Sequence, residues 1–512
     1  MKKSIIKIVS VCAVGLLMLT QTSCSDLLDQ RPQGVWVEGD NPGGSFQTDI
    51  FTLYAKMRGY NVSSGIPPLA LNFRSEDIEK GSTSSDGTGD AAMYDDFNYV
   101  ATNGLIASYW TGNYEMVHLA NKVLTEIKEK EESGEELSDG DIICRAEAHF
   151  FRAFAYFNLV RAFGEVPLID FKINDAAEAN IAKSPAAKIY ELIDSDLTAA
   201  EKLPTTWEKK FTGRLTWGAA RSLHAKTYLM RNDWGNVYAA ATEVMNSKIY
   251  NLDTPYEQIF RESGENTSES IFELQCTATA ALPGSNDIGS QFAQVQGVRG
   301  SGQWDLGWGW HTPTQLLADA FEAGDPRKDE TLLYFYKSQA EADAGVANKP
   351  WGEKPIAANA ISKYYNKKVY TDPTWRTLYT KQGYWVNIRM IRYADVVLMA
   401  AEAANELGNT DDALDFLEQV RARARGTNSS ILPEVTTRDQ IQLRNAIRHE
   451  RRVELGMEWD RFYDLVRWGT ARTVLHAAGK TNYEDKHALL PLPQAEVDKS
   501  NGVLIQNPNY AN

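Results

Sequence analysis

RHERRVELGMEWDRFYDLVRWG, residues 448–469, carries the densest pattern in the chain. Acidic and basic side chains interleave along it at three- and four-residue spacing: Glu450, Arg451, Arg452, Glu454, Glu458, Arg461, Asp464 and Arg467. Residues so spaced are neighbours on a helix surface, and opposite charges there can pair. The arginines could form an anion site, or a lattice of salt bridges could lock two helices together. We favour the lattice, because every arginine has a carboxylate within one helical turn.

Helical periodicity returns in the segments that precede this stretch. Residues 392–425 are expected to form two helices joined at Gly408. Ala401 and Ala413 lie 12 positions apart, the spacing at which tetratricopeptide (TPR) repeats place small residues where paired helices touch. Further helices are expected over 110–130, 139–164, 185–202, 214–231 and 235–247. The pattern predicts a mainly α scaffold of antiparallel helix pairs.

Three long stretches between these helices show little periodicity: residues 60–105, 250–312 and 322–388. They are rich in Gly, Ser, Asn, Asp and aromatic residues, and loops this long in a compact protein are usually functional or mobile. SIFELQCT, residues 270–277, is typical of a small strand. We therefore expect a helical scaffold that carries a loop-rich half with minor β structure.

The composition excludes one class of partner. Of the 512 residues 43% are hydrophobic and 24% are charged, as in ordinary globular proteins, and the formal net charge is −15. Phosphate backbones are bound by clustered Lys and Arg, so we expect no nucleic acid as a partner. Beyond residue 24 the cysteines are Cys144 and Cys276 alone, which gives neither a disulfide framework nor a CxxC pair.

The first 24 residues have the pattern of a bacterial lipoprotein leader. Three lysines precede an apolar run, residues 8–20, which is too short to span a bilayer comfortably but suits a signal peptide. The run leads into QTSC, residues 21–24, where small residues precede the cysteine. We predict a signal peptide over 1–23, lipidation of Cys24 and a membrane anchor. The alternative is an ordinary secretory signal with a coincidental cysteine.

Motifs for catalysis and cofactor binding fail on inspection. HERRVEL, residues 449–455, begins like a zinc-protease helix, but Val453 stands where the second histidine would be. GVRGSGQWDLG, residues 297–307, lacks the GxGxxG spacing, and the chain has no GxSxG elbow. We expect no metal, no cofactor and no catalytic residue. A carboxylate pair of the glycosidase type stays open, because the chain has 68 acidic residues.

Four motifs together resemble the SusD/RagB family of surface lipoproteins of Bacteroidota. They are SDLLD directly after Cys24, RYADVVLMAAEAANELG (392–408), ERRVELGMEWDRFYDLVRWG (450–469) and LLPLPQAEVDKSNGVLIQNPNY (489–510), in family order. The resemblance implies a SusD-like fold in which four TPR-like helix pairs support an irregular, ligand-binding half. It also implies two regions, 24–250 and 251–512, within one compact unit.

The same resemblance implies a function without covalent chemistry. Family members capture oligosaccharide, or peptide in the RagB branch, and deliver it to a SusC-like TonB-dependent outer-membrane transporter that they cap like a lid. We therefore expect a surface-exposed outer-membrane lipoprotein with an oligosaccharide ligand. The alternatives are a peptide ligand, a surface glycoside hydrolase and a scaffold that binds only protein. The excess of aromatic residues favours glycan over peptide.

Two segments match the place of the family's ligand sites, before the first TPR-like helix. NFRSEDIEKG (72–81) resembles the family's R-S-[DE] stretch, and AAMYDDFNY (91–99) follows it. The candidates that they supply are Arg74, Glu76, Tyr94, Asp95 and Asn98. The alternative is that these loop residues satisfy one another.

QWDLGWGWHTP, residues 303–313, adds Trp304, Trp308 and Trp310 as ligand candidates. Residues 300–385 hold six of the 13 tryptophans. The apolar face of a sugar ring matches a flat aromatic face, and such stacking contributes roughly 1–3 kcal/mol if it resembles base stacking. The alternative is that these rings pin the long insertion to the scaffold. Periodicity leaves open which ring points outward.

Overall fold

The computed structural model describes residues 44–510, apart from 87–88, 176, 337, 339, 342–350 and 352–360. Helices form most of this part, and each of its sheets has two strands. The prediction of a mainly α fold with minor β structure is confirmed. The predicted signal peptide and Cys24 lie outside the described residues. Within them, no helix is both long and apolar enough to cross a membrane.

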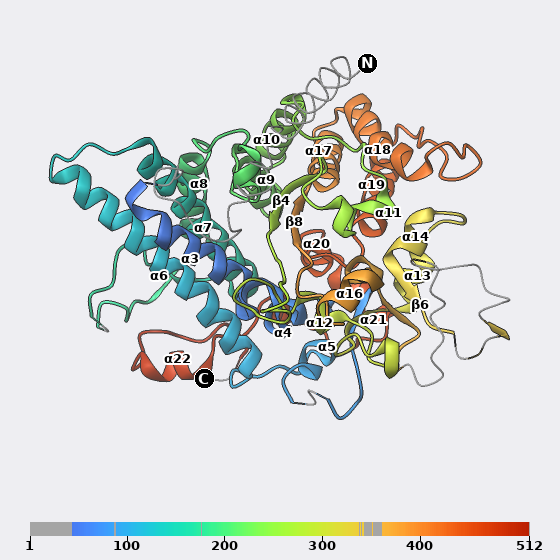
Figure 1. The fold of residues 1–512 in the computed structure, drawn as a ribbon, viewed down its shortest axis with the longest axis horizontal. Coiled ribbons are helices and arrows are strands. Elements are labelled where there is room, and N and C mark those ends of the chain that lie inside the picture. Colours follow the sequence, from blue (N-terminus) through green and yellow to red (C-terminus); the bar gives the residue numbers. More distant parts are fainter. Residues whose placement is uncertain are drawn as a thin grey trace, which may run out of the picture.

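A row of helices forms the scaffold and runs from left to right across Figure 1. They are α6 (Gly104–Glu132), α7 (Asp139–Phe163), α8 (Ala186–Ala200), α9 (Trp217–Met230), α10 (Trp234–Asn246), α17 (Tyr393–Glu406), α18 (Thr410–Arg425) and α19 (Gln440–Glu454). Helices that follow one another in sequence pack as pairs, for example α6 with α7, α9 with α10 and α17 with α18, in line with the helix pairs that the family resemblance implied. Helix α10 packs directly on α17, although the whole central part of the chain separates them in sequence.

Capping residues and small residues explain where these helices end and how closely they pack. Ser138 and Asp141 form a capping box at the start of α7. Gly408 joins α17 to α18 with a φ of +81°, a conformation that glycine adopts without strain. Ala401 and Ala413 are fully buried, which lets the two helices approach each other closely. The predicted boundaries of α7, α17 and α18 are accurate to within a residue or two, whereas α6 starts earlier than predicted.

The stretch 448–469 contains a break between two helices. Helix α19 ends at Glu454, and α20 (Arg461–Arg467) begins after a non-helical turn. Met457 in this turn has a φ of +69°, which a continuous right-handed helix does not allow. The turn redirects the chain, so the charged residues on its two sides meet partners from different parts of the molecule.

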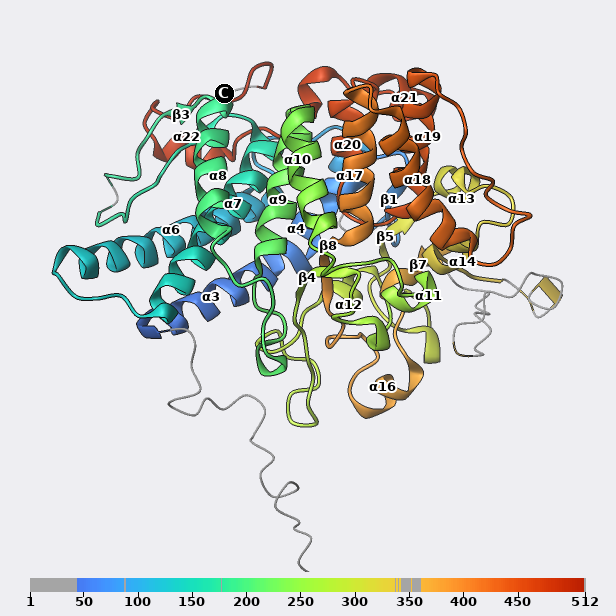
Figure 2. The same ribbon diagram turned by 90° about the horizontal axis from the view of Figure 1, so that it is seen from above.

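The loop-rich half lies below the scaffold in Figure 2. Its helices are α11 (Tyr256–Ile259), η5 (Glu262–Gly264), α12 (Phe292–Gln296), η6 (Gly302–Trp304), α13 (Gln315–Ala320), α14 (Pro326–Thr331), η8 (Lys367–Val369) and α16 (Pro373–Leu378). Its strands are β4 (Ser270–Leu274), β5 (Trp310–Pro313), β6 (Leu332–Tyr334), β7 (Tyr364–Asn366) and β8 (Ile388–Arg392). The strand predicted within 270–277 is confirmed as β4, which pairs antiparallel with β8.

Elements outside the scaffold and the loop-rich half complete the molecule. The N-terminal elements are η1 (Gly44–Phe46), α3 (Gln47–Arg58), η2 (Tyr60–Ser64), α4 (Ile66–Ala70), η3 (Leu71–Arg74), β1 (Ile78–Gly81) and α5 (Ala92–Asp96). The remaining ones are β2 (Val166–Pro167), β3 (Lys183–Ser184), η4 (Lys209–Phe211), α21 (Ala471–Ala477), η9 (Asp485–Ala488) and α22 (Gln494–Lys499). Strand β1 pairs with β5, which joins the N-terminal segment to the loop-rich half.

One hydrophobic core connects the scaffold to the loop-rich half, because buried residues from Ile50 to Leu504 belong to a single cluster. Among the described residues, three smaller clusters lie outside this core, one around Trp304, one around Trp385 and one around Tyr256. Cys144 is buried and Cys276 is half-buried, and the two are not joined in a disulfide.

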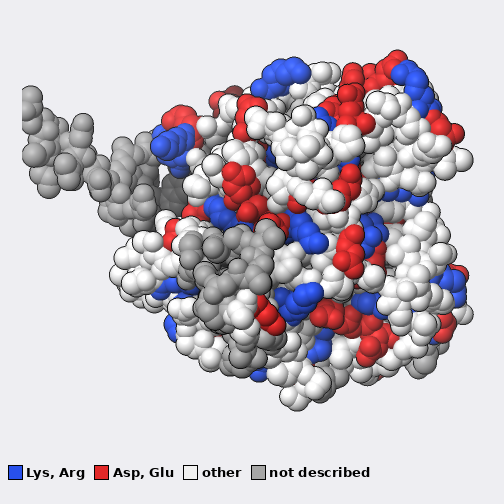
Figure 3. Space-filling view, turned by 90° about the vertical axis from the view of Figure 1, so that its right-hand side faces the viewer, with Lys and Arg blue, Asp and Glu red and all other residues white. Residues whose placement is uncertain are grey.

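Charges of both signs are interspersed on the face that Figure 3 shows, which is the right-hand side of Figure 1. A phosphate backbone requires a continuous basic track. Among the residues described on this face, no such track is present.

Candidate ligand-binding surface

Two loops that are far apart in sequence meet at the edge of the β1–β5 pair. The backbone N–H of Ser82 donates to the carbonyl of Gly309 at 2.6 Å. Gly309 has a φ of +72°, and a Cβ at this position would lie only 2.7 Å from Arg299 Cβ. Only glycine fits such a place without strain. The glycine beside Trp308 therefore fixes the path of this loop against the other.

The three candidate tryptophans lie in different environments. Trp304 and Trp310 are 4% and 5% exposed, so neither ring presents a face to solvent. Trp304 stacks on Tyr370 at 6.3 Å, and the Lys80 ammonium lies 5.1 Å from the ring centroid of Trp310. Trp308 is half-buried and packs on the main core. Of the three, only Trp308 has part of its surface open to a ligand.

Trp308 lies among half-buried amide and aromatic side chains, which we call the amide–aromatic strip. Its members are Gln291, Gln294, Trp308 and Tyr384. The backbone N–H of Trp308 donates to the backbone carbonyl of Gln294 at 2.8 Å. The Gln294 Oε1 accepts hydrogen bonds from Tyr384 Oη and Gln291 Nε2, both at 2.9 Å. Gln294 on α12 thus connects the side chains of Gln291 and Tyr384 with the backbone of Trp308.

An ion pair lies beside the strip, where the two loops meet. Arg299 contacts the carboxylate of Asp86, and the Ser82 hydroxyl donates to the same carboxylate at 2.8 Å. Burial alone would raise the pKa of Asp86, but Ser82 and Arg299 lower that pKa below its ordinary value. Asp86 is therefore ionised at neutral pH and is not a proton donor.

Arg74 and Glu76 hold the N-terminal segment against α20. Arg74 is fully buried, and its guanidinium lies 4.0 Å from the ring centroid of Phe462, a cation–π contact. Glu76 is 3% exposed and forms an ion pair with Arg461. Both candidates thus lie inside the molecule, in contact with another part of the chain.

Tyr94, Asp95 and Asn98 are not brought together with the strip. Tyr94 is fully buried, and Asp95 accepts a hydrogen bond from Lys480 Nζ at 2.6 Å. Asn98 is exposed and lines an open polar hollow of about 480 Å³ near the C-terminal segment, together with Tyr483. In the described part of the chain, the lining of this hollow shares no residue with the strip.

A larger open hollow of about 710 Å³ lies on the scaffold between α6 and α22. Trp110 and Tyr114 line it, but they are only 5% and 7% exposed. The Tyr114 hydroxyl donates to the carbonyl of Pro167 at 2.7 Å. These rings are largely occupied by contacts within the protein, so they offer a ligand less aromatic surface than their number indicates.

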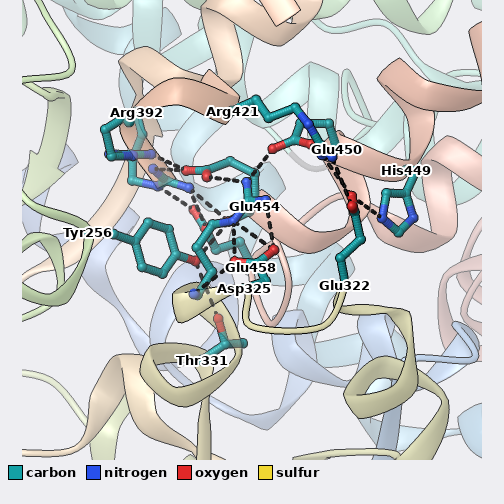
Figure 4. A network of polar contacts seen from close by, with 12 residues as sticks. Tyr256, Glu322, Asp325, Thr331, Arg392, Arg421, His449, Glu450, Glu454 and Glu458 are labelled. Atoms are coloured by element: carbon teal, nitrogen blue, oxygen red, sulfur yellow. Dashed lines mark hydrogen bonds and ion pairs between the residues drawn. The ribbon is translucent and has the colours of Figure 1, made fainter. Parts of the chain in front are cut away.

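The charged residues of 448–469 form a buried network (Figure 4). The Glu454 carboxylate contacts Arg327 at 3.2 Å, Arg392 at 3.1 Å and Arg423 at 2.6 Å. Burial alone would raise the pKa of Glu454, but these arginines hold it well below its ordinary value. The interpretation as a structural lattice of salt bridges is confirmed.

The partners in this network differ from those that the sequence suggested. Arg451 contacts Asp395 of α17 at 2.5 Å and Asp464 of α20 at 2.8 Å. Arg467 contacts Glu402 of α17 at 2.7 Å, and its contact with Asp464 is a local pair within one helix. Most ion pairs therefore join different elements, and these arginines are occupied by carboxylates rather than left for an anion.

Sequence reasoning missed Gln291, Gln294 and Tyr384. Amide side chains carry no motif of their own, and Tyr384 reaches Gln294 across 90 residues of sequence. The one signal available was the excess of aromatics in 300–385. As for metals, the part of the chain that the structure describes contains no group of three or more His, Cys, Asp or Glu side chains that could hold an ion.

The fold defines a class of protein in which a helical-repeat scaffold carries an irregular, loop-rich half. Comparison with known families places the chain within this class. Residues 268–510 match the model of the SusD family, and residues 55–229 match a model described as "Starch-binding associating with outer membrane". The chain belongs to the SusD/RagB family.

Individual relatives agree with this assignment over most of their length. "SusD-like protein P2" of Formosa agariphila is 28% identical, with 97% of this chain and 98% of that protein covered. "Starch-binding protein SusD" of Bacteroides thetaiotaomicron is 22% identical over 72% of each chain. The solved structure of a "Laminarin binding SusD-like protein" has a TM-score of 0.74 and 28% identity, and covers 91% of this chain and 98% of that one.

A further solved structure shows the same fold at lower identity. It is surface glycan-binding protein A of Bacteroides thetaiotaomicron in complex with laminarihexaose, with a TM-score of 0.73 and 23% identity. It covers 90% of this chain and 98% of that one. The SusD-like fold predicted from the sequence is confirmed.

Proposed function

We propose that this protein captures an oligosaccharide on the amide–aromatic strip without altering it chemically. The observation that carries the proposal is the strip itself: the half-buried Trp308 is hydrogen-bonded through its backbone to Gln294, whose side-chain amide is fixed by Tyr384 and Gln291. Relatives named for laminarin and starch binding support a glycan ligand, and a glucan in particular.

The chemistry of the strip suits a neutral sugar. The C–H face of a pyranose ring can stack on the indole of Trp308, since aromatic faces bind flat apolar surfaces. The hydroxyl groups at the ring edge need donors and acceptors, which Gln291 and Gln294 supply on the same surface. Tyr384 orients Gln294, so these groups are arranged before the ligand arrives, which lowers the entropic cost of binding.

Binding without catalysis is also part of the proposal. A glycosidase needs one carboxyl group that is protonated and a second carboxylate nearby. One carboxylate beside the strip is the half-buried Asp86, whose pKa is lowered by Ser82 and Arg299 although burial alone would raise it. Release of reducing sugar from laminarin or starch by the purified protein would contradict this part.

We further propose that the protein delivers its ligand to a SusC-like TonB-dependent transporter at the cell surface. Membership in the family supports this role, and one matching model describes an association with the outer membrane. The predicted lipid on Cys24 would hold the protein beside its partner. Copurification of the transporter with the tagged protein from membranes tests the partnership, and its absence under crosslinking would contradict it.

The ligand site is tested by replacing Trp308 with alanine. Loss of one stacking ring is expected to weaken binding of laminarihexaose or maltohexaose by about 1–3 kcal/mol, or roughly 5- to 150-fold. Isothermal titration measures the dissociation constant, and circular dichroism checks that helicity is retained.

Trp234→Ala is the matched control, because Trp234 is a half-buried tryptophan on the scaffold helix α10. Equal losses of affinity in both variants would contradict a site at the strip. Binding of peptides and of no glycan by the wild-type protein would instead support the RagB-like alternative.

A further inference from the structure

A second exposed aromatic surface lies on α16, at the end of the loop-rich half that is far from the scaffold in Figure 2. Trp375 is 37% exposed, whereas Trp385 beneath it is 2% exposed. Their rings stack with centroids 6.0 Å apart and an interplanar angle of 27°. Trp385 therefore packs on Trp375, while more than a third of Trp375 stays exposed.

Contacts on several sides hold this surface rigidly. Tyr379 lies 5.7 Å from both Trp375 and Trp385, measured between ring centroids. The indole N–H of Trp385 donates to Glu262 Oε1 at 2.9 Å. Trp385 also shares a small hydrophobic cluster with Ala293 of α12, the helix that carries Gln294 and directly follows Gln291. Trp375 and Tyr379 thus belong to the same packed unit as the amide–aromatic strip.

The chain itself limits the distance between the two aromatic surfaces. Tyr379, which packs against Trp375, and Tyr384 of the strip are five residues apart in sequence. Since an extended chain spans at most about 3.6 Å per residue, their Cα atoms are no more than about 18 Å apart. Lys381 between them donates to the carbonyl of Gly302 at 2.9 Å, which ties this connection to the loop before the strip.

We propose that Trp375 and Tyr379 form a second stacking platform for the oligosaccharide that binds the strip. The inference rests on the proposed function and sharpens it, because it identifies the ligand as a long glycan chain held at two places. Short sugars would contact only the strip. A chain that reaches both platforms binds the second one intramolecularly, which raises its affinity without any new contact at the strip.

The neighbours of Trp375 favour a sugar over a docked protein. Thr374 and Thr377 on α16 are exposed and place hydroxyl-bearing side chains beside the ring. A protein interface would be expected to present a contiguous apolar patch. Leu378, which is 63% exposed, is an apolar neighbour of Trp375 on this helix. Replacing Leu378 therefore tests whether the surface binds a sugar or an apolar protein surface.

The experiment titrates the full chain with a hexasaccharide and with a disaccharide of the same series, laminarihexaose with laminaribiose or maltohexaose with maltose. Trp375→Ala is expected to raise the dissociation constant of the hexasaccharide about tenfold, within the range for loss of one stacked ring, and to leave that of the disaccharide unchanged. Trp375→Phe should restore much of the affinity. Leu378→Ala should bind both sugars as the wild type does.

Unchanged hexasaccharide affinity in a folded Trp375→Ala variant would overturn the inference while the proposed function stands. An equal loss for disaccharide and hexasaccharide would also overturn it, because Trp375 would then act on the strip. A loss in Leu378→Ala as large as that in Trp375→Ala would indicate an apolar docking surface instead. Failure of the wild type to bind either hexasaccharide would overturn the proposed function, and with it this extension.

Discussion

The environment of a single ring decides whether a tryptophan can bind ligand. Trp304, Trp308 and Trp310 lie within seven positions, yet two are enclosed and one is part-exposed. The difference arises because Gly309 takes a positive φ and β5 begins at Trp310, so the chain direction changes between the rings. Residue type alone predicts a ligand for all three, whereas the backbone path separates them.

Trp304→Ala is expected to destabilise the fold, because this ring fills the center of a small cluster beneath the loops. Removal of a buried tryptophan typically costs about 3–5 kcal/mol. Urea denaturation of the variant and the wild type measures the difference. Trp308→Ala serves as the comparison, since its ring is only half-buried, and a loss there as large as in Trp304→Ala would assign Trp308 to the core.

Arg74 and Glu76 show what residue-level resemblance can and cannot predict. Their segment matches the family pattern, and both residues are buried. Their partners, Phe462 and Arg461, come from a segment almost 400 residues later in the chain. No local pattern predicts such a contact, so their burial was not foreseeable from their own neighbours in sequence.

At the level of elements, helices were predicted well and loops poorly, for a physical reason. Helices α7 to α10, α17 and α18 carry apolar periodicity and their own end signals, such as the capping box at Ser138 and Gly408 after α17. The two-stranded sheets depend on partners far away, and β1 pairs with β5 across more than 200 residues. Periodicity contains no information about such pairs.

Removing one carboxylate from the network around Glu454 is expected to destabilise the fold, because buried arginines would lose a compensating charge. Glu454→Gln preserves the shape of the side chain but leaves Arg327, Arg392 and Arg423 without this carboxylate. Breaking a buried ion pair by removing one partner costs about 3–5 kcal/mol. Chemical denaturation measures the loss.

Glu418→Gln is the control for this prediction, because Glu418 pairs with Arg425 in a more exposed setting. Exposed pairs contribute about 0–1 kcal/mol. Similar losses in Glu454→Gln and Glu418→Gln would contradict a structural role of the buried network.

The start of α7 gives a pH-dependent prediction. Burial alone would raise the pKa of Asp141, but Lys130 and the backbone N–H groups of Ser45 and Ser138 lower it to about 2. Because the pKa in the folded state lies below the ordinary value, this contribution to stability is complete above about pH 4 and is lost as the pH falls toward 2.

Asp141→Asn is therefore expected to lower the free energy of unfolding by about 1–2 kcal/mol at pH 6. The difference in free energy of unfolding between variant and wild type should become smaller at pH 2.5, because the wild-type carboxylate begins to take up a proton there. Denaturant titrations at the two pH values measure this difference. An equal difference in free energy of unfolding at pH 6 and at pH 2.5 would show that the effect comes from altered packing or hydrogen bonding and not from the charge of Asp141.

At the scale of the whole molecule, the family was recognisable from four motifs, and two of them supply packing contacts of the scaffold. RYADVVLMAAEAANELG forms α17 in the middle of the helix row, and the 450–469 motif supplies the ion pairs that tie helices and loops together. The ligand surface depends on loop geometry, which no motif encodes. Fold was therefore predictable, while the choice among ligand residues required the structure.

Membrane attachment is a property of the whole chain, and the lipid prediction is tested by Cys24→Ala. The variant is expected to move from the membrane fraction to the soluble fraction, because the acyl chains of a lipoprotein supply its anchor. Fractionation and immunoblotting measure the distribution. Full retention of the variant in a cell that lacks the transporter would contradict the lipid anchor, since the partner could no longer hold it there.

The central claim, a glycan held on the amide–aromatic strip, is tested most directly by a crystal structure with laminarihexaose or maltohexaose, whichever binds. We expect a sugar ring stacked on Trp308, hydroxyl groups within hydrogen-bond distance of Gln291 or Gln294, and further sugar residues extending toward Trp375. Sugar bound instead in the hollow between α6 and α22, with none on the loop-rich half, would contradict the claim.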